Sequence, residues 1–333
     1  MADLRTKYLG LNLRTPLVVS ANPLSQKIDN ILQMEDSGAG AVVLFSLFEE
    51  QIRNEAAHLE EMYKSTSQMF AEASGFFPEV DDFGVGSSEY LELIHQAKKR
   101  TNMPIIGSLN GVTPEGWLQY AKEIEQAGAD ALELNVFFVA ANNTYTADYV
   151  EQRYVDILTE LKKDLKIPVA VKLNPYFSSL ANMAKKLEQA GANGLVLFNR
   201  FYQPDFDIYK LKVLNNLDLS QSQEIRLPLL WLAVLSGRTS CSLAATTGIE
   251  SADELVKYIL AGADVGMVAS SLYRHGISHI NIILAELENY MNIMGFKDLA
   301  AFRGHLSQAR VANPTAFERT NYIQIIEDKK YRI

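Results

Sequence analysis

Residues 128–135 read Gly-Ala-Asp-Ala-Leu-Glu-Leu-Asn, and this stretch decides the fold. Its Gly-Ala-Asp ends an amphipathic stretch, and an apolar run begins immediately at Ala131. A glycine suits the left-handed residue just past a helix, and a continuous apolar run is typical of a strand buried on both faces. The stretch therefore predicts a helix that ends and passes directly into a buried strand.

The same Gly-Ala-x phrase precedes an apolar run at 38–40, 191–193 and 262–264. Further strand-like runs bring the predicted strands to eight: 16–21, 41–44, 104–109, 131–134, 168–173, 194–197, 241–246 and 265–268. Helical periodicity separates them, at 27–37, 48–73, 89–100, 114–127, 147–165, 179–190, 227–235, 251–261 and 279–294. Eight strands alternating with helices, without a linker, predict an α/β fold of the (β/α)8 or TIM barrel type. An open doubly wound sheet is the alternative, but it does not usually need eight strands.

Three segments extend the predicted barrel. A turn near Gly10 indicates an N-terminal hairpin at 6–15 that plugs one end of the barrel, and long loops are inserted at 75–86 and 199–226. Such loops at the carboxyl ends of strands are usually functional lids, and a structural cover is the alternative. We expect a single domain over 1–333, with its core at about 16–294 and a C-terminal extension, 295–333, that carries short helices at 298–306 and 314–327.

The composition restricts the partners and the compartment. The 333 residues include 31 basic and 40 acidic ones, a net charge of −9, so a nucleic-acid surface, which needs clustered cations, is not expected. The longest apolar run, 228–235, is far shorter than the roughly 18 residues of a membrane span. Cys241 is the one cysteine and cannot form an internal disulfide, and the first residues lack the features of a signal peptide. We expect a cytoplasmic protein without a membrane segment.

Polar residues stand at the carboxyl ends of the predicted strands, where barrels of this type place their chemistry. They are mostly asparagines and hydroxyl residues: Ser20, Asn22, Ser46, Ser108, Asn110, Asn135, Lys172, Asn174, Asn199, Arg200, Thr246, Thr247, Ser270 and Ser271. This set suits a heteroaromatic ring with amide edges better than a metal. His-Glu-x-x-His, Cys-x-x-Cys and Gly-x-Ser-x-Gly motifs do not occur, so we expect no metal site.

Lys172 is the lysine at a strand end, inside the apolar run 169–173. Burying a lysine is costly unless a partner uses its charge, which favours a functional residue over one that extends to the rim. Asn135 ends the neighbouring strand in the same way, and we place Glu133 on the alternate face of that strand. A polar cap that bonds the barrel backbone is the alternative for Asn135.

Small residues at 244–249 and 268–272 follow the seventh and eighth strands. Small residues at two adjacent strand ends let backbone amides surround a phosphate, although packing alone also selects them. The two stretches predict a phosphate-binding cup.

Several of these phrases together resemble the dihydroorotate dehydrogenases, FMN-dependent barrels of pyrimidine synthesis. In order between about Lys7 and Leu306, the matching phrases are PLVVSAN at 16–22, SGAGAVV at 37–43, LELN at 132–135, PVAVKL at 168–173, TTGI at 246–249, AGAD at 261–264 and FRG at 302–304. The chain is most similar to the soluble branch of that family, because the N-terminal extension of the membrane branch is missing.

The resemblance implies an FMN cofactor and an oxidoreductase that acts on CH–CH groups. It implies that Asn135 and Lys172 contact the flavin ring, where the lysine favours the negative charge that collects near N1 and the C2 carbonyl on reduction. The residues that it assigns to the cofactor are Ser20, Ala21, Ser46, Asn135, Lys172, Thr247, Gly248, Ala269 and Ser270.

The chain departs from the family where the substrate is bound. The family has Ser-Cys-Pro-Asn, or a serine for that cysteine, after the strand-four asparagine, and this residue removes a proton from C5 of dihydroorotate while C6 gives hydride to the flavin. Phe138 occupies that base position and cannot accept a proton, so Thr144 or Tyr145 is a weak substitute. Phe45 replaces a family lysine. The family's asparagine-glycine substrate loop and its glycine pair are replaced by the acidic insertion around Asp81 and Asp82 and by Ser222-Gln223.

Three functions remain open from the sequence. The first is an FMN-dependent oxidoreductase that acts on dihydroorotate by a weaker route or on a related compound. The second is a phosphate-binding barrel without flavin that performs an isomerase or lyase step, in which Lys172 forms a Schiff base or acts as an electrophile. The third is a flavoprotein without catalysis. The expected partner is a small-molecule substrate, and a homodimer is a possible assembly.

Overall fold

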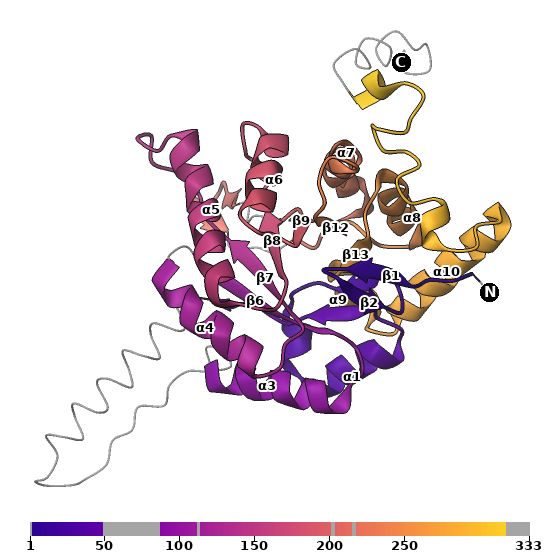
Figure 1. Ribbon diagram of the computed structural model, residues 1–333, viewed down its shortest axis with the longest axis horizontal. Coiled ribbons are helices and arrows are strands. Elements are labelled where there is room, and N and C mark those ends of the chain that lie inside the picture. The colour runs from indigo at the N-terminus through magenta and orange to yellow at the C-terminus, as the bar shows by residue number, and fades with distance from the viewer. Residues whose placement is uncertain (1, 49–86, 112–113, 201–203, 215–217, 318–333) are drawn as a thin grey trace, which may run out of the picture.

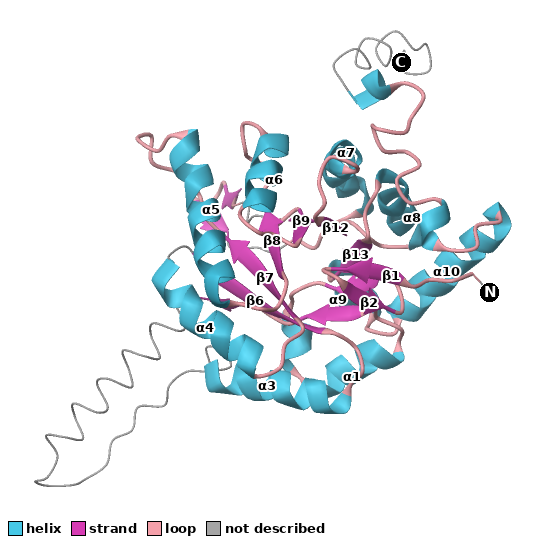
Figure 2. Cartoon of the chain, in the orientation of Figure 1, coloured by secondary structure: helices cyan, strands magenta, loops and turns pink. Residues whose placement is uncertain are grey.

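The computed structural model describes residues 2–48, 87–111, 114–200, 204–214 and 218–317. All eight predicted strands form and pair in parallel: β3 (Leu17–Val19), β4 (Ala41–Val43), β6 (Ile105–Gly111), β7 (Ala131–Val136), β8 (Val169–Leu173), β9 (Gly194–Leu197), β12 (Ser242–Thr246) and β13 (Val265–Val268). The pairing of β4 with both β3 and β6 closes the sheet, and a short strand β5 (Leu47–Phe48) adds to β6. Helices surround the strands (Figures 1 and 2), which confirms the (β/α)8 barrel.

The described helices follow the predicted periodicity closely. They are α1 (Ile28–Asp36), α3 (Ser87–Arg100), α4 (Pro114–Gln126), α5 (Ala147–Asp164), α6 (Leu180–Gln189), α7 (Arg226–Leu235), α8 (Ala252–Ala261) and α10 (His279–Met294). Helix α9 (Ser270–His275) was not predicted, because six residues are too few to show a helical period. The helix predicted at 48–73, apart from Phe48, and the insertion at 75–86 with Asp81 and Asp82 lie outside the described residues.

The Gly-Ala-x phrases end helices as predicted. Gly38, Gly128, Gly191 and Gly262 have positive φ angles of 102°, 101°, 98° and 122°. A side chain would also crowd Gly262, since its Cβ would lie 2.2 Å from Oγ of Ser236. A glycine therefore lets each of these helices turn directly into the strand that follows.

The N-terminal hairpin fills one end of the barrel, as the sequence predicts. Its antiparallel strands are β1 (Thr6–Tyr8) and β2 (Leu11–Leu13). Tyr8 and Leu9 are buried in one cluster with inward residues of the barrel strands. A Cβ on Gly194, the first residue of β9, would lie 2.5 Å from Cδ2 of Leu9. The hairpin thus packs against the start of a barrel strand and closes the interior at the N-terminal end.

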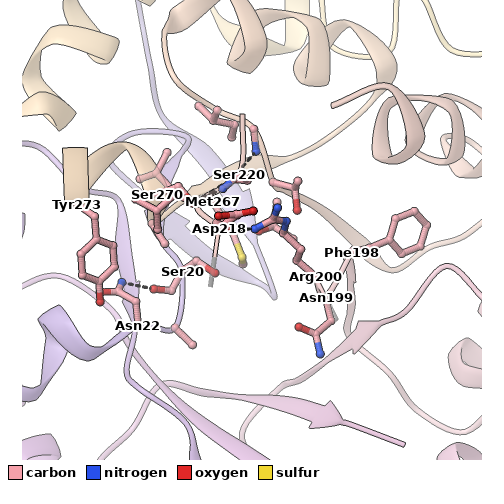
Figure 3. Close-up of a pocket in the computed structure, with 18 of the residues that line it drawn as sticks. Ser20, Asn22, Phe198, Asn199, Arg200, Asp218, Ser220, Met267, Ser270 and Tyr273 are labelled. Carbon is pink, nitrogen blue, oxygen red and sulfur yellow. Dashed lines mark hydrogen bonds between the residues drawn. The ribbon is translucent and has the colours of Figure 1, made fainter. Parts of the chain in front are cut away.

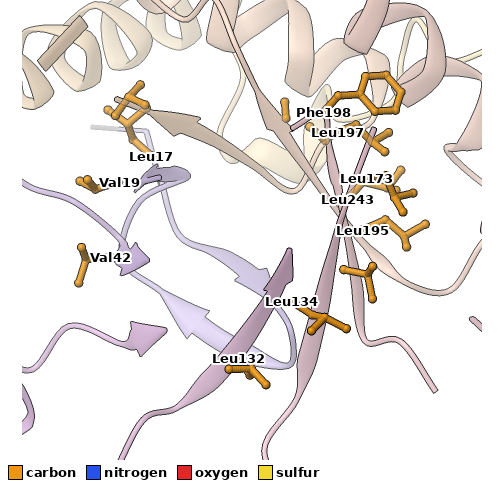
Figure 4. Close-up of a cluster of buried hydrophobic side chains, with 14 of the residues drawn as sticks. Leu17, Val19, Val42, Leu132, Leu134, Leu173, Leu195, Leu197, Phe198 and Leu243 are labelled. Carbon is orange, nitrogen blue, oxygen red and sulfur yellow. The ribbon is translucent and has the colours of Figure 1, made fainter. Parts of the chain in front are cut away.

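The outer face of the strands packs against the helices (Figure 4). Leucines and valines on that face, among them Leu132, Leu134 and Leu195, belong to a large buried core that includes helix residues. Alternate residues such as Ala131 and Val196 belong to the separate inner cluster. Apolar residues on both faces explain why these strands show no alternation in the sequence.

The segments after the sixth and eighth strands are less regular. A small hairpin of β10 (Asp205–Asp207) and β11 (Lys212–Leu214) precedes a short 3-10 helix, η2 (Ser222–Ile225). In the C-terminal extension, the helix predicted at 298–306 reduces to a 3-10 turn, η3 (Leu299–Ala301), and the described start of the helix predicted at 314–327 is a 3-10 turn, η4 (Pro314–Phe317). Residues 318–327 of the second predicted helix lie outside the described part.

Candidate active site

A cavity of about 650 Å³ opens at the carboxyl ends of the barrel strands (Figure 3). Most of the residues assigned to the cofactor line it: Ser20, Ala21, Lys172, Thr247, Gly248, Ala269 and Ser270. Side chains from the segment after the sixth strand, including Arg200 and Ser220, also face this space. Ser46 and Asn135, assigned to the same group, are not among the lining residues.

Lys172 is held at the cavity wall by a buried carboxylate. Its Nζ lies 3.2 Å from Oε1 of Glu133 and donates a hydrogen bond to Oγ of Ser20 at 3.4 Å. Ala131, Glu133 and Asn135 are every second residue of β7, so their side chains lie on the same face of the strand. The side chain of Ala131 belongs to the inner cluster. The prediction that Glu133 lies on the opposite face is therefore wrong, because alternation places both side chains toward the barrel interior. Glu133 is a site residue that the sequence reasoning missed.

Asparagine side chains form the rim beside Lys172. Asn135 is in register with Lys172 on β8 and with Asn110 on β6. Its Oδ1 accepts a hydrogen bond of 2.9 Å from Nδ2 of Asn199, which lines the cavity. Asn110 and Asn135 are both more than nine-tenths buried. The predicted polar strand ends thus come together as neighbouring amides on one side of the barrel mouth.

The phosphate-binding cup predicted at the seventh and eighth strands contains a third segment. The amide of Gly248 donates to Oγ of Ser220 at 3.2 Å, and that hydroxyl donates to Oγ of Ser270 at 2.9 Å. Gly248 has a φ of 75°, and a Cβ there would lie 2.7 Å from the carbonyl oxygen of Gln221. Ser220 therefore connects the two predicted halves, and its distance along the chain from both of them hid it from the sequence reasoning.

Phe138 and its two proposed substitutes are not among the residues that line the cavity. The guanidinium carbon of Arg153, on α5, lies 4.2 Å from the centre of the Phe138 ring. The Tyr145 ring lies 5.7 Å from Phe138 and 4.8 Å from Tyr149. The hydroxyl of Thr144 donates to Oδ1 of Asn142 at 2.9 Å on the exposed surface. These contacts hold the loop against α5.

Phe45 and Ser46, which follow β4, also contact neighbouring side chains. The Phe45 ring is buried and contacts Tyr90 edge-on, with 4.9 Å between ring centres. Oγ of Ser46 lies 2.8 Å from Oγ of Ser108 on the neighbouring strand. The apolar ring thus stands where the resemblance leads one to expect a lysine.

Tyr154 and Cys241 are buried, and neither lines the cavity. Burial raises the pKa of Tyr154, so its phenol stays protonated and donates a 3.0 Å hydrogen bond to the carbonyl of Val136 at the end of β7. Burial also raises the pKa of the Cys241 thiol. Cys241 directly precedes β12, at the opposite end of the barrel from the cavity, so it is a structural residue.

The described residues contain neither a metal-binding cluster nor a membrane-spanning helix. None of their clusters of His, Cys, Asp and Glu contains the three ligands that a metal ion needs. Within the same part of the chain, none of the helices has the length and apolar character to cross a membrane.

The sequence was compared with known proteins. A family model described as dihydroorotate dehydrogenase matches residues 3–291. The catalytic subunit of dihydroorotate dehydrogenase B (NAD(+)) of Thermoplasma acidophilum is 28% identical over 302 residues, which cover 88% of this chain and 95% of that protein. The subunit of the same name from Thermoplasma volcanium is 26% identical over 315 residues, covering 91% and 98%. The family match spans the barrel and every cavity-lining residue described above, and the chain therefore belongs to the dihydroorotate dehydrogenase family.

Proposed function

We propose that the protein is an FMN-dependent oxidoreductase that removes hydride from a CH–CH group of a small cyclic substrate. The observation that carries this proposal is the position of Lys172, paired with Glu133 at 3.2 Å, in the same cavity as the backbone at Gly248. FMN supplies a ring that accepts hydride, and a cation beside that ring stabilises the charge that develops on it. Family membership supports an oxidoreductase of this kind.

The residues present fit FMN at both of its ends. At one end, Lys172 and the amide of Asn199 offer donors to the polar edge of a flat ring system. At the other end, the backbone at Gly248 and the hydroxyls of Ser220 and Ser270 lie within hydrogen-bond reach of one another and suit a phosphate. A side chain at 248 would collide with the carbonyl oxygen of Gln221 and with Ile225, so the backbone there would have to move. We propose that Thr247 and Ala269 complete the phosphate end, and that Ser20 and Ala21 border the ring.

We propose a substrate that is less polar than dihydroorotate. The cations among the described cavity-lining residues are Lys172 and Arg200, and each is paired with a carboxylate, Glu133 at 3.2 Å and Glu224 at 2.9 Å. A substrate carboxylate would have to displace one of these pairs. Oxidation of a CH–CH group releases one hydride and one proton, and Phe138 cannot accept the proton, so we propose that the proton passes to water.

A flavoprotein without catalysis is the second candidate, and the replacement of the base by Phe138 favours it. The visible spectrum of the purified protein with added FMN decides whether flavin binds at all, and a preparation that stays colourless refutes both candidates in favour of the flavin-free barrel. Anaerobic addition of dihydroorotate or of 5,6-dihydrouracil, the same ring without the carboxylate, then tests catalysis. We expect bleaching of the flavin by the uncharged compound, and no bleaching by any cyclic CH–CH donor supports the non-catalytic protein.

We further propose that the protein works in the cytoplasm. Its cysteine, Cys241, is buried and unpaired, as is usual in a reducing compartment. Fractionation of cells that produce the protein tests this location.

A further inference from the structure

Glu133 is a buried carboxyl side chain in the interior of the barrel. The exposed fraction of its side chain is 1%, and that of Lys172 is 9%. One carboxylate oxygen of Glu133 contacts Lys172, and the other, Oε2, has no hydrogen-bond partner among the described residues. The hydroxyl of Tyr8, in the hairpin that closes the barrel, also lacks a partner in this part of the chain.

The surroundings of Glu133 give it no structural purpose beyond Lys172. The inner cluster below it consists of apolar residues such as Ala131, Ala170 and Val196. Burial and then the charge of Glu133 raise the pKa of Tyr8 well above its usual range, so the carboxylate acts electrostatically on the hairpin side as well. An apolar pair of similar volume is often at least as stable as a buried ion pair, so packing alone does not account for this one.

We propose that Glu133 is a positioning residue that holds Nζ of Lys172 at the cavity wall and offsets the positive charge of that lysine toward bound flavin. This inference rests on the proposed function, since it requires FMN in the cavity. Bound FMN would gain negative charge on its ring on reduction, and Lys172 would stabilise that charge. The carboxylate of Glu133 opposes it. The pair thereby holds the reduction potential of the flavin below the value that Lys172 alone would give.

The substitution Glu133→Gln separates charge from position. Glutamine is nearly isosteric and keeps an oxygen that can accept from Nζ of Lys172, so only the negative charge is lost. We expect the flavin potential to become more positive and reduced FMN to bind about tenfold more tightly relative to oxidised FMN, because one opposing charge near the ring is removed. Glu133→Asp withdraws the carboxylate by one methylene and is expected to shift the potential in the same direction by a smaller amount.

The chain offers a matched control. Glu151, on α5, is also more than nine-tenths buried and pairs with Lys186 at 2.8 Å, but neither residue lines the cavity. Glu151→Gln makes the same chemical change in a partly buried ion pair on the helices outside the barrel strands. We expect it to leave the flavin potential unchanged.

The measurement is anaerobic reduction of the FMN-loaded protein against a reference dye, with the affinities for both flavin states from fluorescence titration. An order of potentials in which the unaltered protein is lowest, Glu133→Asp intermediate and Glu133→Gln highest supports the inference. Equal potentials in the unaltered protein and in Glu133→Gln overturn it while leaving the proposed function intact. If Glu133→Gln does not fold, an unchanged potential in Glu133→Asp overturns it. Failure of the unaltered protein to bind FMN is a different result and refutes the proposed function itself.

Discussion

The close packing around Gly248 allows a prediction of how much stability and FMN affinity a substitution there would cost. Gly248→Ala places a Cβ 2.7 Å from the carbonyl oxygen of Gln221 and 2.8 Å from Cγ2 of Ile225, at a φ of 75°. A positive φ costs a non-glycine residue about 1–2 kcal/mol, and overpacking of a rigid site costs about 1–3 kcal/mol more. We therefore expect the free energy of unfolding to fall by about 2–5 kcal/mol, with FMN affinity reduced at least tenfold, because the backbone that holds the phosphate must move.

Gly295→Ala is the matched control for this substitution. Gly295 also has a positive φ, 74°, at the end of α10, but a Cβ there would meet nothing within 4 Å. Its expected cost is the backbone strain alone, about 1–2 kcal/mol, with no change in FMN affinity. Urea unfolding of the two variants and fluorescence titration with FMN give both quantities. Equal losses of stability in the two variants, together with unchanged FMN binding in Gly248→Ala, would refute the proposal that the tightly packed backbone at Gly248 holds the FMN phosphate.

Three further predictions concern the cavity. Lys172→Met leaves Glu133 buried without its partner, so we expect a loss of about 3–5 kcal/mol in urea unfolding and a bound flavin that is harder to reduce; unchanged stability and potential would contradict the pairing. Ser220→Ala removes the hydroxyl that joins Gly248 to Ser270, so FMN affinity is expected to fall about tenfold in fluorescence titration, whereas equal affinity would show that the bridge does not support the cofactor. Dihydroorotate oxidation is expected to be slow in the unaltered protein, because Phe138 cannot act as a base and base catalysis typically supplies about 10² to 10⁴ in rate. Brisk turnover would show that another residue is the base. The variant Phe138→Cys tests whether a thiol at this position alone raises the rate.

The barrel could be predicted from the sequence because its signals are local. Each Gly-Ala-x phrase combines a helix end that needs a positive φ with a strand buried on both faces, and each of these two features can be recognised within a few residues. The strand ends followed from the same reasoning, and Lys172 and Gly248, which the sequence places at two strand ends, line one cavity.

The parts of the site that were missed depend on distant or ambiguous signals. Glu133 was placed on the wrong face because a continuous apolar run does not show which residues alternate inward. Ser220 lies 28 residues before Gly248, in a segment without helical or strand period. The packing of Phe138 on Arg153 depends on where α5 lies relative to its loop, and a sequence motif contains no such information.

The hairpin at the N-terminal end of the barrel has a consequence for synthesis of the chain. Thr6 and Leu9 donate hydrogen bonds to partners 258 and 233 residues later, at Asp264 and Ser242. At a translation rate of about 5–20 residues per second, the first of these segments to be made waits roughly 10 to 50 s before its partners exist. Through that interval the apolar residues of the hairpin are exposed to chaperones and to neighbouring nascent chains. The hairpin thus leaves the ribosome well before the strands that bury it, and it is among the last parts of the barrel to be buried.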